Sequence, residues 1–140
     1  MTCNSGGMAV LNLWVKRNAT FRRTFQFSSD DGENYDIAGW GFEMEVRPSL
    51  GSDTIAFTVN LTPNANGSVI TITDPTPING QGGGEIEVYI SNDDILLIPE
   101  ASPVSDPTSY VYDLVATDIE GDFAPFFGGS FTVIPGVTEL

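Results

Sequence analysis

Apolar and polar residues alternate along most of this chain of 140 residues. The clearest case is the segment 40–47, in which Phe42, Met44 and Val46 alternate with charged residues. Successive side chains of a β-strand point to opposite faces, so this spacing places one face against a core and the other in water. The same period recurs in further short segments that are separated by turn residues. The sequence therefore predicts an all-β domain.

The predicted strands are short, and clusters of Gly, Pro, Asn and Asp separate them. Strands are expected at 10–15, 19–28, 40–47, 55–61, 69–73, 85–91, 109–117 and 126–134. One segment predicts a helix of one or two turns, because Ser91 can cap it, Asp93 and Asp94 suit its first turn, and Pro99 ends it. Seven or eight short, mostly antiparallel strands fit an immunoglobulin-like β-sandwich, and a jelly roll is the alternative.

The alternation also predicts which side chains form the core. The expected core residues are Trp14, Phe25, Phe27, Phe42, Met44, Val46, Phe57, Val59, Ile86, Val88, Tyr112, Leu114, Phe131 and Val133. Arg23 falls on the apolar face of its strand, so we expect that a bulge displaces it or that a carboxylate pairs with it. The segment 109–117 is apolar on both faces, which predicts a central strand that is covered on both sides.

The inventory of reactive side chains excludes most catalytic mechanisms. The chain has no His, a single Cys (Cys3) and a single Lys (Lys16). A Ser-His-Asp triad, a Cys-His dyad, a zinc site with His or several Cys ligands and a Walker lysine loop therefore cannot be assembled. Carboxylates two residues apart, as in Glu43 and Glu45, lie on polar strand faces, where a solvated surface is the ordinary explanation. We expect no enzymatic activity and no cofactor.

The charge of the chain is large and unevenly distributed. The formal net charge of -14 at pH 7 repels phosphate backbones and anionic lipids, so neither nucleic acid nor a membrane is an expected partner. No Lys or Arg follows Arg47, whereas acidic residues continue to the end. This asymmetry favours a basic edge and an acidic face that meet complementary charges on neighbouring subunits. Acidic loops that only solvate the protein are the alternative.

Two loops have compositions that suggest a ligand. The segment Asp30–Asp36 gathers carboxylates, which suit calcium, although it lacks the spacing of a calcium-binding loop. The run Gly80–Gly84 is superficially similar to a phosphate loop, but Glu85 stands where the last glycine would be and no helix follows. We therefore expect a turn at the first segment, with calcium as an alternative, and a flexible loop at the second.

The N-terminus is predicted to be a flexible arm, residues 1–9, ahead of one domain at 10–140. These first residues lack the positive and apolar regions of a signal peptide, and the chain has no apolar run of about eighteen residues. Cys3 has no second cysteine with which to form an intrachain disulfide. Synthesis in a reducing cytoplasm is the expectation.

Two stretches resemble small virion proteins of tailed bacteriophages. The first is LWVKRNATF at 13–21, followed by YDIAGW at 35–40 and FEMEVR at 42–47. The second is YDL at 112–114 with Asp118 and Gly121, followed by GSFTVIPGVT at 129–138. The resemblance covers about residues 11–138. It implies an immunoglobulin-like tail or baseplate component, similar to the N-terminal domain of phage upper baseplate proteins, and it implies no enzyme.

The expected function is therefore that of a structural virion protein, made in the host cytoplasm, in the tail, the baseplate or the head-to-tail region. It would bind other virion proteins and be present as a homo-oligomer or in several copies of a symmetric assembly. A capsid decoration (cement) protein and a calcium-dependent carbohydrate-binding module are the alternatives. The residues expected at the protein interface are Lys16, Arg17, Arg22, Phe126 and Phe127, because the bases follow the arm and the aromatic pair lies beside Pro125 and glycines.

Overall fold

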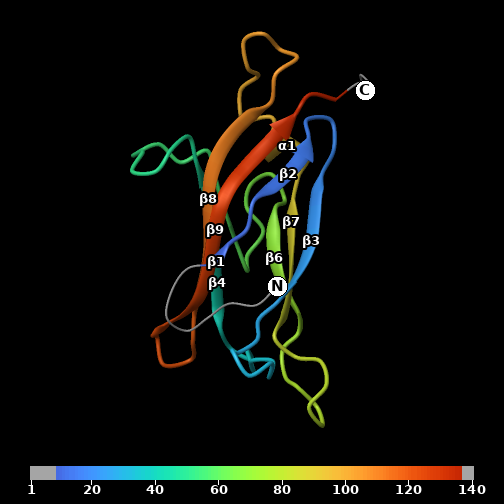
Figure 1. Cartoon of the computed structure of the whole chain (residues 1–140), viewed down its shortest axis with the longest axis vertical. Helices are drawn as coiled ribbons and strands as arrows, with labels where there is room; N and C mark the ends of the chain where they lie inside the picture. The colour runs from blue at the N-terminus through green and yellow to red at the C-terminus, as the bar shows by residue number, and fades with distance from the viewer. Residues whose placement is uncertain (1–8, 137–140) are drawn as a thin grey trace.

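The chain folds into two β-sheets that pack face to face (Figure 1). The computed structural model describes the backbone of residues 9–136, and the side chains of all of these except 124–126. Sheet A contains β1 (Ala9–Val10), β2 (Leu13–Lys16), β4 (Gly41–Arg47), β5 (Phe57–Asn60), β8 (Thr108–Thr117) and β9 (Phe123–Ile134). Sheet B contains β3 (Phe21–Gln26), β6 (Val69–Asp74) and β7 (Glu85–Ile90). A short helix, α1 (Asn92–Ile95), follows β7.

The strand order identifies the sandwich as immunoglobulin-like. In sheet A, β8 lies between β4 and β9, β5 forms one edge, and both β1 and β2 pair with the outer side of β9. In sheet B, β7 lies between β3 and β6. The β1 and β2 pairings with β9 are parallel, and the other strand pairs are antiparallel. The predicted fold class is thus confirmed.

The predicted strands agree with the observed strands within a few residues, except that the first is divided into β1 and β2. The break lies beside Gly129, where a Cβ atom would be 2.7 Å from the Leu11 carbonyl oxygen. The Asn12 side chain accepts a hydrogen bond from the Ser130 backbone N–H at 3.0 Å and so replaces a ladder bond at the break. Ala9 pairs with Phe127, so the domain begins before the predicted boundary. The rest of the predicted arm, residues 1–8, lies outside the described residues.

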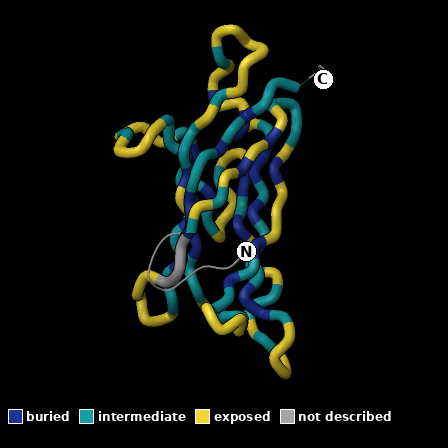
Figure 2. The backbone as a smooth tube through the Cα atoms, viewed as in Figure 1, coloured by how far each residue is buried: buried dark blue, intermediate teal, exposed yellow. Residues whose placement is uncertain are grey.

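The core lies between the two sheets, and Figure 2 marks the buried residues of the chain in dark blue. Every predicted core residue is buried except Trp14, whose side chain is 62% exposed. Its neighbours Leu13 and Val15 are buried instead. The predicted alternation of inward and outward side chains was correct, but the choice of the inward side chain was wrong. All three residues are apolar, so the alternation alone does not decide whether Trp14 or its two neighbours face inward.

Neither predicted explanation of Arg23 is correct. The register between β3 and β7 is continuous, so no bulge displaces the residue. No acidic side chain in the described structure forms an ion pair with Arg23, whose guanidinium lies 5.6 Å from the centre of the Phe25 ring. Because β3 is an edge strand, this long side chain lies along the aromatic ring and reaches water around the edge of the sheet.

A buried polar cluster fixes α1 to the sandwich. Ser91 caps the helix, as predicted, and accepts a hydrogen bond from the Asp94 backbone N–H. The Asp94 side chain is only 1% exposed and accepts hydrogen bonds from Asn64 Nδ2 at 2.8 Å, from Asn66 Nδ2 at 2.7 Å and from the Ser68 hydroxyl. The cluster therefore joins the helix between β7 and β8 to the connection between β5 and β6.

The glycine run before β7 packs more closely than a flexible loop would. Gly83 and Gly84 are buried and have positive φ angles. A Cβ atom on Gly83 would lie 2.4 Å from the Pro77 nitrogen, and one on Gly84 would lie 2.6 Å from the Phe27 carbonyl oxygen. These glycines are therefore required by close backbone approach as well as by their φ angles.

We expect Gly83→Ala to lower the free energy of unfolding by about 3 kcal/mol and Gly80→Ala to lower it by only about 1 kcal/mol. Both positions have similar φ angles, 82° and 75°, but a Cβ atom on Gly80 meets no atom within 4 Å. Urea denaturation of the two variants measures the difference. Equal losses of unfolding free energy in the two variants would show that Pro77 can move away from the new Cβ atom without destabilising the fold.

Candidate protein-binding surfaces

The free edges of β2 and β3 lie at the same side of the sandwich. Within the described sheets, β2 pairs only with β9 and β3 pairs only with β7. A groove of about 400 Å³, lined by residues 14–16 and 19–23, lies between the two edges. We call it the edge groove. It exposes the free backbone edges of two strands, to which another protein can add a strand or a loop.

The edge groove is basic and partly aromatic. Lys16, Arg22 and Arg23 are exposed residues that line it, and the exposed Trp14 ring is beside them. The Arg22 guanidinium lies 4.6 Å from the centre of the Tyr89 ring, and its Nη1 lies 2.6 Å from Glu87 Oε1. None of the lining residues is acidic. The groove therefore favours a partner surface that carries carboxylates.

Arg17 does not belong to the edge groove, although the sequence predicted it at the interface. Its Nη1 donates a hydrogen bond to the Ile98 carbonyl oxygen at 2.8 Å. Its own carbonyl oxygen accepts a hydrogen bond from Asn92 Nδ2, also at 2.8 Å. Arg17 thus holds the turn between β2 and β3 against α1 and the segment after it. Of the predicted bases, the structure brings only Lys16 and Arg22 together.

The predicted aromatic contact is not supported for Phe127. This side chain is fully buried, and its ring centre lies 4.9 Å from that of Phe25. The predicted strand at this position is confirmed, since Phe127 lies within β9, but its side chain faces the core instead of being exposed beside the glycines. The side chain of Phe126 lies outside the described part of the structure. Sequence reasoning missed Trp14 and Arg23 as groove residues, although the conflict between Arg23 and the apolar pattern was a signal.

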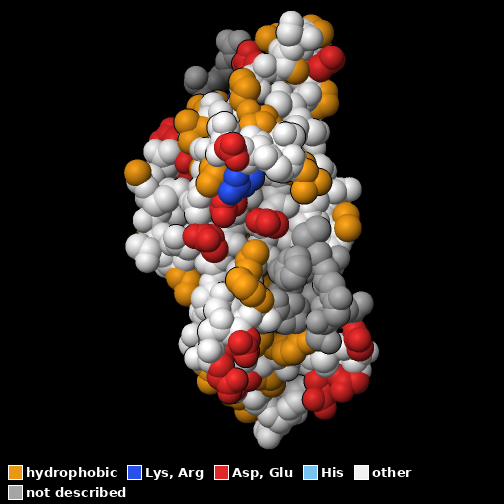
Figure 3. Space-filling model, turned by 90° about the vertical axis from the view of Figure 1, so that its left-hand side faces the viewer, with side chains coloured by type: hydrophobic (Ala, Val, Ile, Leu, Met, Phe, Trp, Pro, Cys, Tyr) orange, Lys and Arg blue, Asp and Glu red, His pale blue; other side chains and the backbone are white. Residues whose placement is uncertain are grey.

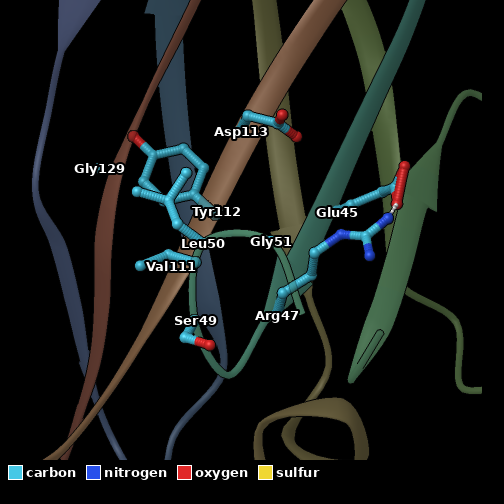
Figure 4. A pocket seen from close by; sticks show the side chains of 9 residues that line it. All are labelled: Glu45, Arg47, Ser49, Leu50, Gly51, Val111, Tyr112, Asp113 and Gly129. Carbon is cyan, nitrogen blue, oxygen red and sulfur yellow. Dashed lines mark hydrogen bonds and ion pairs between the residues drawn. The ribbon is translucent and has the colours of Figure 1, made fainter. Parts of the chain in front are cut away.

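The outer face of sheet A contains a second concave region. On β8 the inner residues are buried, but Val111 and Val115 on the outer face are half-buried, and no described element covers them. The prediction that β8 is covered on both sides is therefore wrong. A hollow of about 310 Å³ lies here, bordered by the loop after β4 (Figure 4). Figure 3 shows a basic group on this side of the molecule with acidic side chains around it.

The charges of this hollow are only partly paired. Arg47 Nη2 lies 2.7 Å from Glu45 Oε2, and Arg47 Nη1 donates to the Ser52 carbonyl oxygen at 2.6 Å. Asp113 lies directly opposite Glu45 in the β4–β8 register. Partial burial raises the pKa of Asp113, and the Glu45 charge raises it further, while Arg47 opposes the change. Two like charges are thus held opposite each other, which disfavours the folded state.

We expect Asp113→Asn to be more stable than the wild type at pH 7, but by no more than about 0.5 kcal/mol, because water screens the charge of this exposed side chain. The folded-state pKa lies above the unfolded value, so the cost of the charge is present above the folded pKa. It disappears as the pH falls toward the unfolded pKa. Thermal melts between neutral and acidic pH should therefore show the advantage of the variant shrinking on acidification. A stability difference that grows on acidification would contradict this. So would a Glu120→Gln control, which also removes one negative charge, if its stability changed with pH in the same way.

The loops at the lower end of Figure 1 are acidic. The connections 28–40 and 118–122 are in contact there, because a Cβ atom on Gly39 would lie 3.0 Å from Ile119 Cγ2. We define the acidic end by the carboxylates of these two loops, which are Asp30, Asp31, Glu33, Asp36, Asp118, Glu120 and Asp122. Red side chains gather at this end in Figure 3 as well. The two loops carry no Lys or Arg.

Local hydrogen bonds fix the turn 29–33 within the acidic end. The Ser29 backbone N–H donates to the Glu33 carbonyl oxygen at 2.7 Å, and that of Gly32 donates to the Ser29 carbonyl oxygen at 3.0 Å. The Asp31 carboxylate accepts from the Ser29 hydroxyl and from the Glu33 N–H, which lowers the pKa of Asp31. Across the described residues, no three His, Cys, Asp or Glu side chains are placed to share a metal ion. The calcium alternative thus gains no support from the geometry.

Comparison with known proteins does not assign the chain to a family. No family model matches the sequence, and no curated protein matches it. In residues 9–136, no helix is long and apolar enough to cross a membrane.

The described surfaces include two regions of opposite charge. The edge groove offers exposed cations, an indole and two free strand edges. The acidic end offers carboxylates on hydrogen-bonded turns. These features are suited to charge-complementary contacts between proteins.

Proposed function

We propose that this chain is a structural, non-catalytic virion protein of a tailed bacteriophage, and that it binds a neighbouring virion protein through the edge groove. The observation that carries the binding role is the convergence of two free strand edges on a groove lined by Trp14 and three cations. The assignment to the tail, baseplate or head-to-tail region is supported by the resemblance of residues 11–138 to phage virion proteins.

The geometry favours an acidic strand or loop of the partner. Main-chain groups at the edges of β2 and β3 can pair with a strand or loop, and Lys16 and Arg23 can pair with its carboxylates. Trp14 adds apolar contact area at low entropic cost because its side chain has few rotatable bonds. Partial desolvation of the charges on binding strengthens these contacts.

Incorporation into phage particles tests the proposal. Particles are purified from cells in which the phage encodes either the wild-type chain or Lys16→Glu combined with Arg23→Glu. We expect the wild-type chain in the particles and an incorporation of the variant that is lower by about tenfold, because two attractive charge contacts become repulsive. Quantitative mass spectrometry of the purified particles measures the copy number.

The matched control is Thr54→Glu combined with Thr62→Glu, which also adds acids at exposed positions, but on either side of β5 at the other edge of sheet A. Urea denaturation must show that both proteins are folded. Absence of the wild-type chain from the particles would overturn the virion assignment. Its presence together with normal incorporation of the groove variant would show that another surface makes the contact.

A further inference from the structure

We propose that the edge groove of one copy receives the turn 29–33 of a second copy. The proposal rests on the proposed function, because it uses the same groove, and it names the partner as another molecule of this chain. Three of the five basic residues line the groove, and Arg22 among them is paired with Glu87. Arg17 and Arg47 lie elsewhere and are held by backbone carbonyl oxygens. Lys16 and Arg23, which form no ion pair among the described residues, are thus together in the groove.

The turn 29–33 has the opposite charge and is closed by hydrogen bonds. It carries three exposed carboxylates, on Asp30, Asp31 and Glu33, and it closes between the paired residues Ser28 and Asn34. Its backbone hydrogen bonds are already made within the isolated copy. Little conformational entropy is therefore lost when the turn enters a concave basic groove.

The groove and the turn of one copy cannot meet each other. In Figure 1 the β2–β3 turn lies at the upper end of the sandwich and the loop 28–40 lies at the lower end. The contact can form only between copies, and it joins two different surfaces. Such a heterologous contact repeats from copy to copy and builds a ring or an open chain.

The net charge of the chain determines how this contact depends on salt. Two copies, each of formal charge -14, repel one another when the salt concentration is low. At physiological salt the screening length is about 8 Å, so the repulsion between distant acids is screened more than the attraction at the contact. High salt weakens the contact as well. Association is therefore expected to be strongest at intermediate salt.

Sedimentation velocity with two charge-reversed variants tests the inference. One variant carries Lys16→Glu and Arg23→Glu in the groove, and the other carries Asp30→Lys and Glu33→Lys in the turn. At millimolar protein and intermediate salt, the wild type is expected to associate, and each variant alone should associate about tenfold more weakly or remain monomeric. A mixture of the two variants should associate again, because the unaltered groove of the turn variant meets the unaltered turn of the groove variant, and the two reversed surfaces also carry opposite charges.

A control variant reverses charge in the other turn of the acidic end, by Glu120→Lys and Asp122→Lys, and should associate as the wild type does. A monomeric wild type at every salt concentration would overturn the copy-to-copy contact, as would equal loss in the control or failure of the mixture to associate. Incorporation of the chain into phage particles is measured in a separate experiment, as described for the proposed function. A wild-type chain that enters particles through its groove but does not associate with itself would leave the proposed function standing and refute this inference.

Discussion

Phe127→Ala is expected to lower the free energy of unfolding by about 3–5 kcal/mol. The side chain is fully buried, and its ring lies against Phe25 of sheet B, Phe27 just after β3, and Tyr112 of sheet A. Truncation removes the contact of one ring with both sheets and leaves a cavity that the surrounding strands can only partly fill. Urea denaturation followed by far-ultraviolet circular dichroism measures the loss.

Phe123→Ala provides the matched control for this substitution. Phe123 lies on the same strand but is 80% exposed, so its truncation should change the free energy of unfolding by less than about 0.5 kcal/mol. A loss at Phe127 as small as the loss at Phe123 would mean that this aromatic cluster is not the centre of the core.

Asp94→Ala is expected to cost about 2–3 kcal/mol. The substitution removes the acceptor of three side-chain hydrogen bonds and leaves the Ser68 hydroxyl buried without its acidic partner. Asp94→Asn retains one acceptor oxygen and should cost less. The loss is measured by chemical denaturation of the two variants and the wild type under the same conditions.

Asp93→Ala is the control for the buried cluster, because Asp93 is the exposed neighbour in the same helix. It should cost only a few tenths of a kcal/mol through weaker interaction with the helix end. If the two Ala variants were equally stable, the hydrogen bonds to Asp94 would contribute no net stability.

The alternation of apolar residues was sufficient to predict the strands and nearly all of the core, because burial of one strand face imposes a period of two. It could not set the phase at Trp14, where both neighbours are also apolar. It also could not show that Asp94 is buried, since its partners Asn64, Asn66 and Ser68 come from a distant loop. Long-range hydrogen bonds of this kind have no local sequence pattern.

The candidate surface was predictable in part. The concentration of bases before position 48 indicated a basic edge, and Lys16 and Arg22 do line one groove. The position of Arg17 depends on the Ile98 carbonyl oxygen, which lies far away in the chain. The burial of Phe127 depends on the register of β9 with β8, which the neighbouring glycines obscured. Both errors arise from contacts made only in the folded sandwich.

The pairing of β2 with β9 has a consequence for the timing of assembly. One wall of the groove comes from the strand at residues 13–16, and that strand is held in place by residues 131–134. During synthesis β2 therefore emerges from the ribosome early, but it can pair within the sheet only after β9, the last strand, has emerged. Contacts across such a long stretch of chain also form slowly. A partner that recognises the finished groove would thus distinguish fully folded subunits from nascent ones, so premature aggregation and incorporation of incomplete chains are both disfavoured.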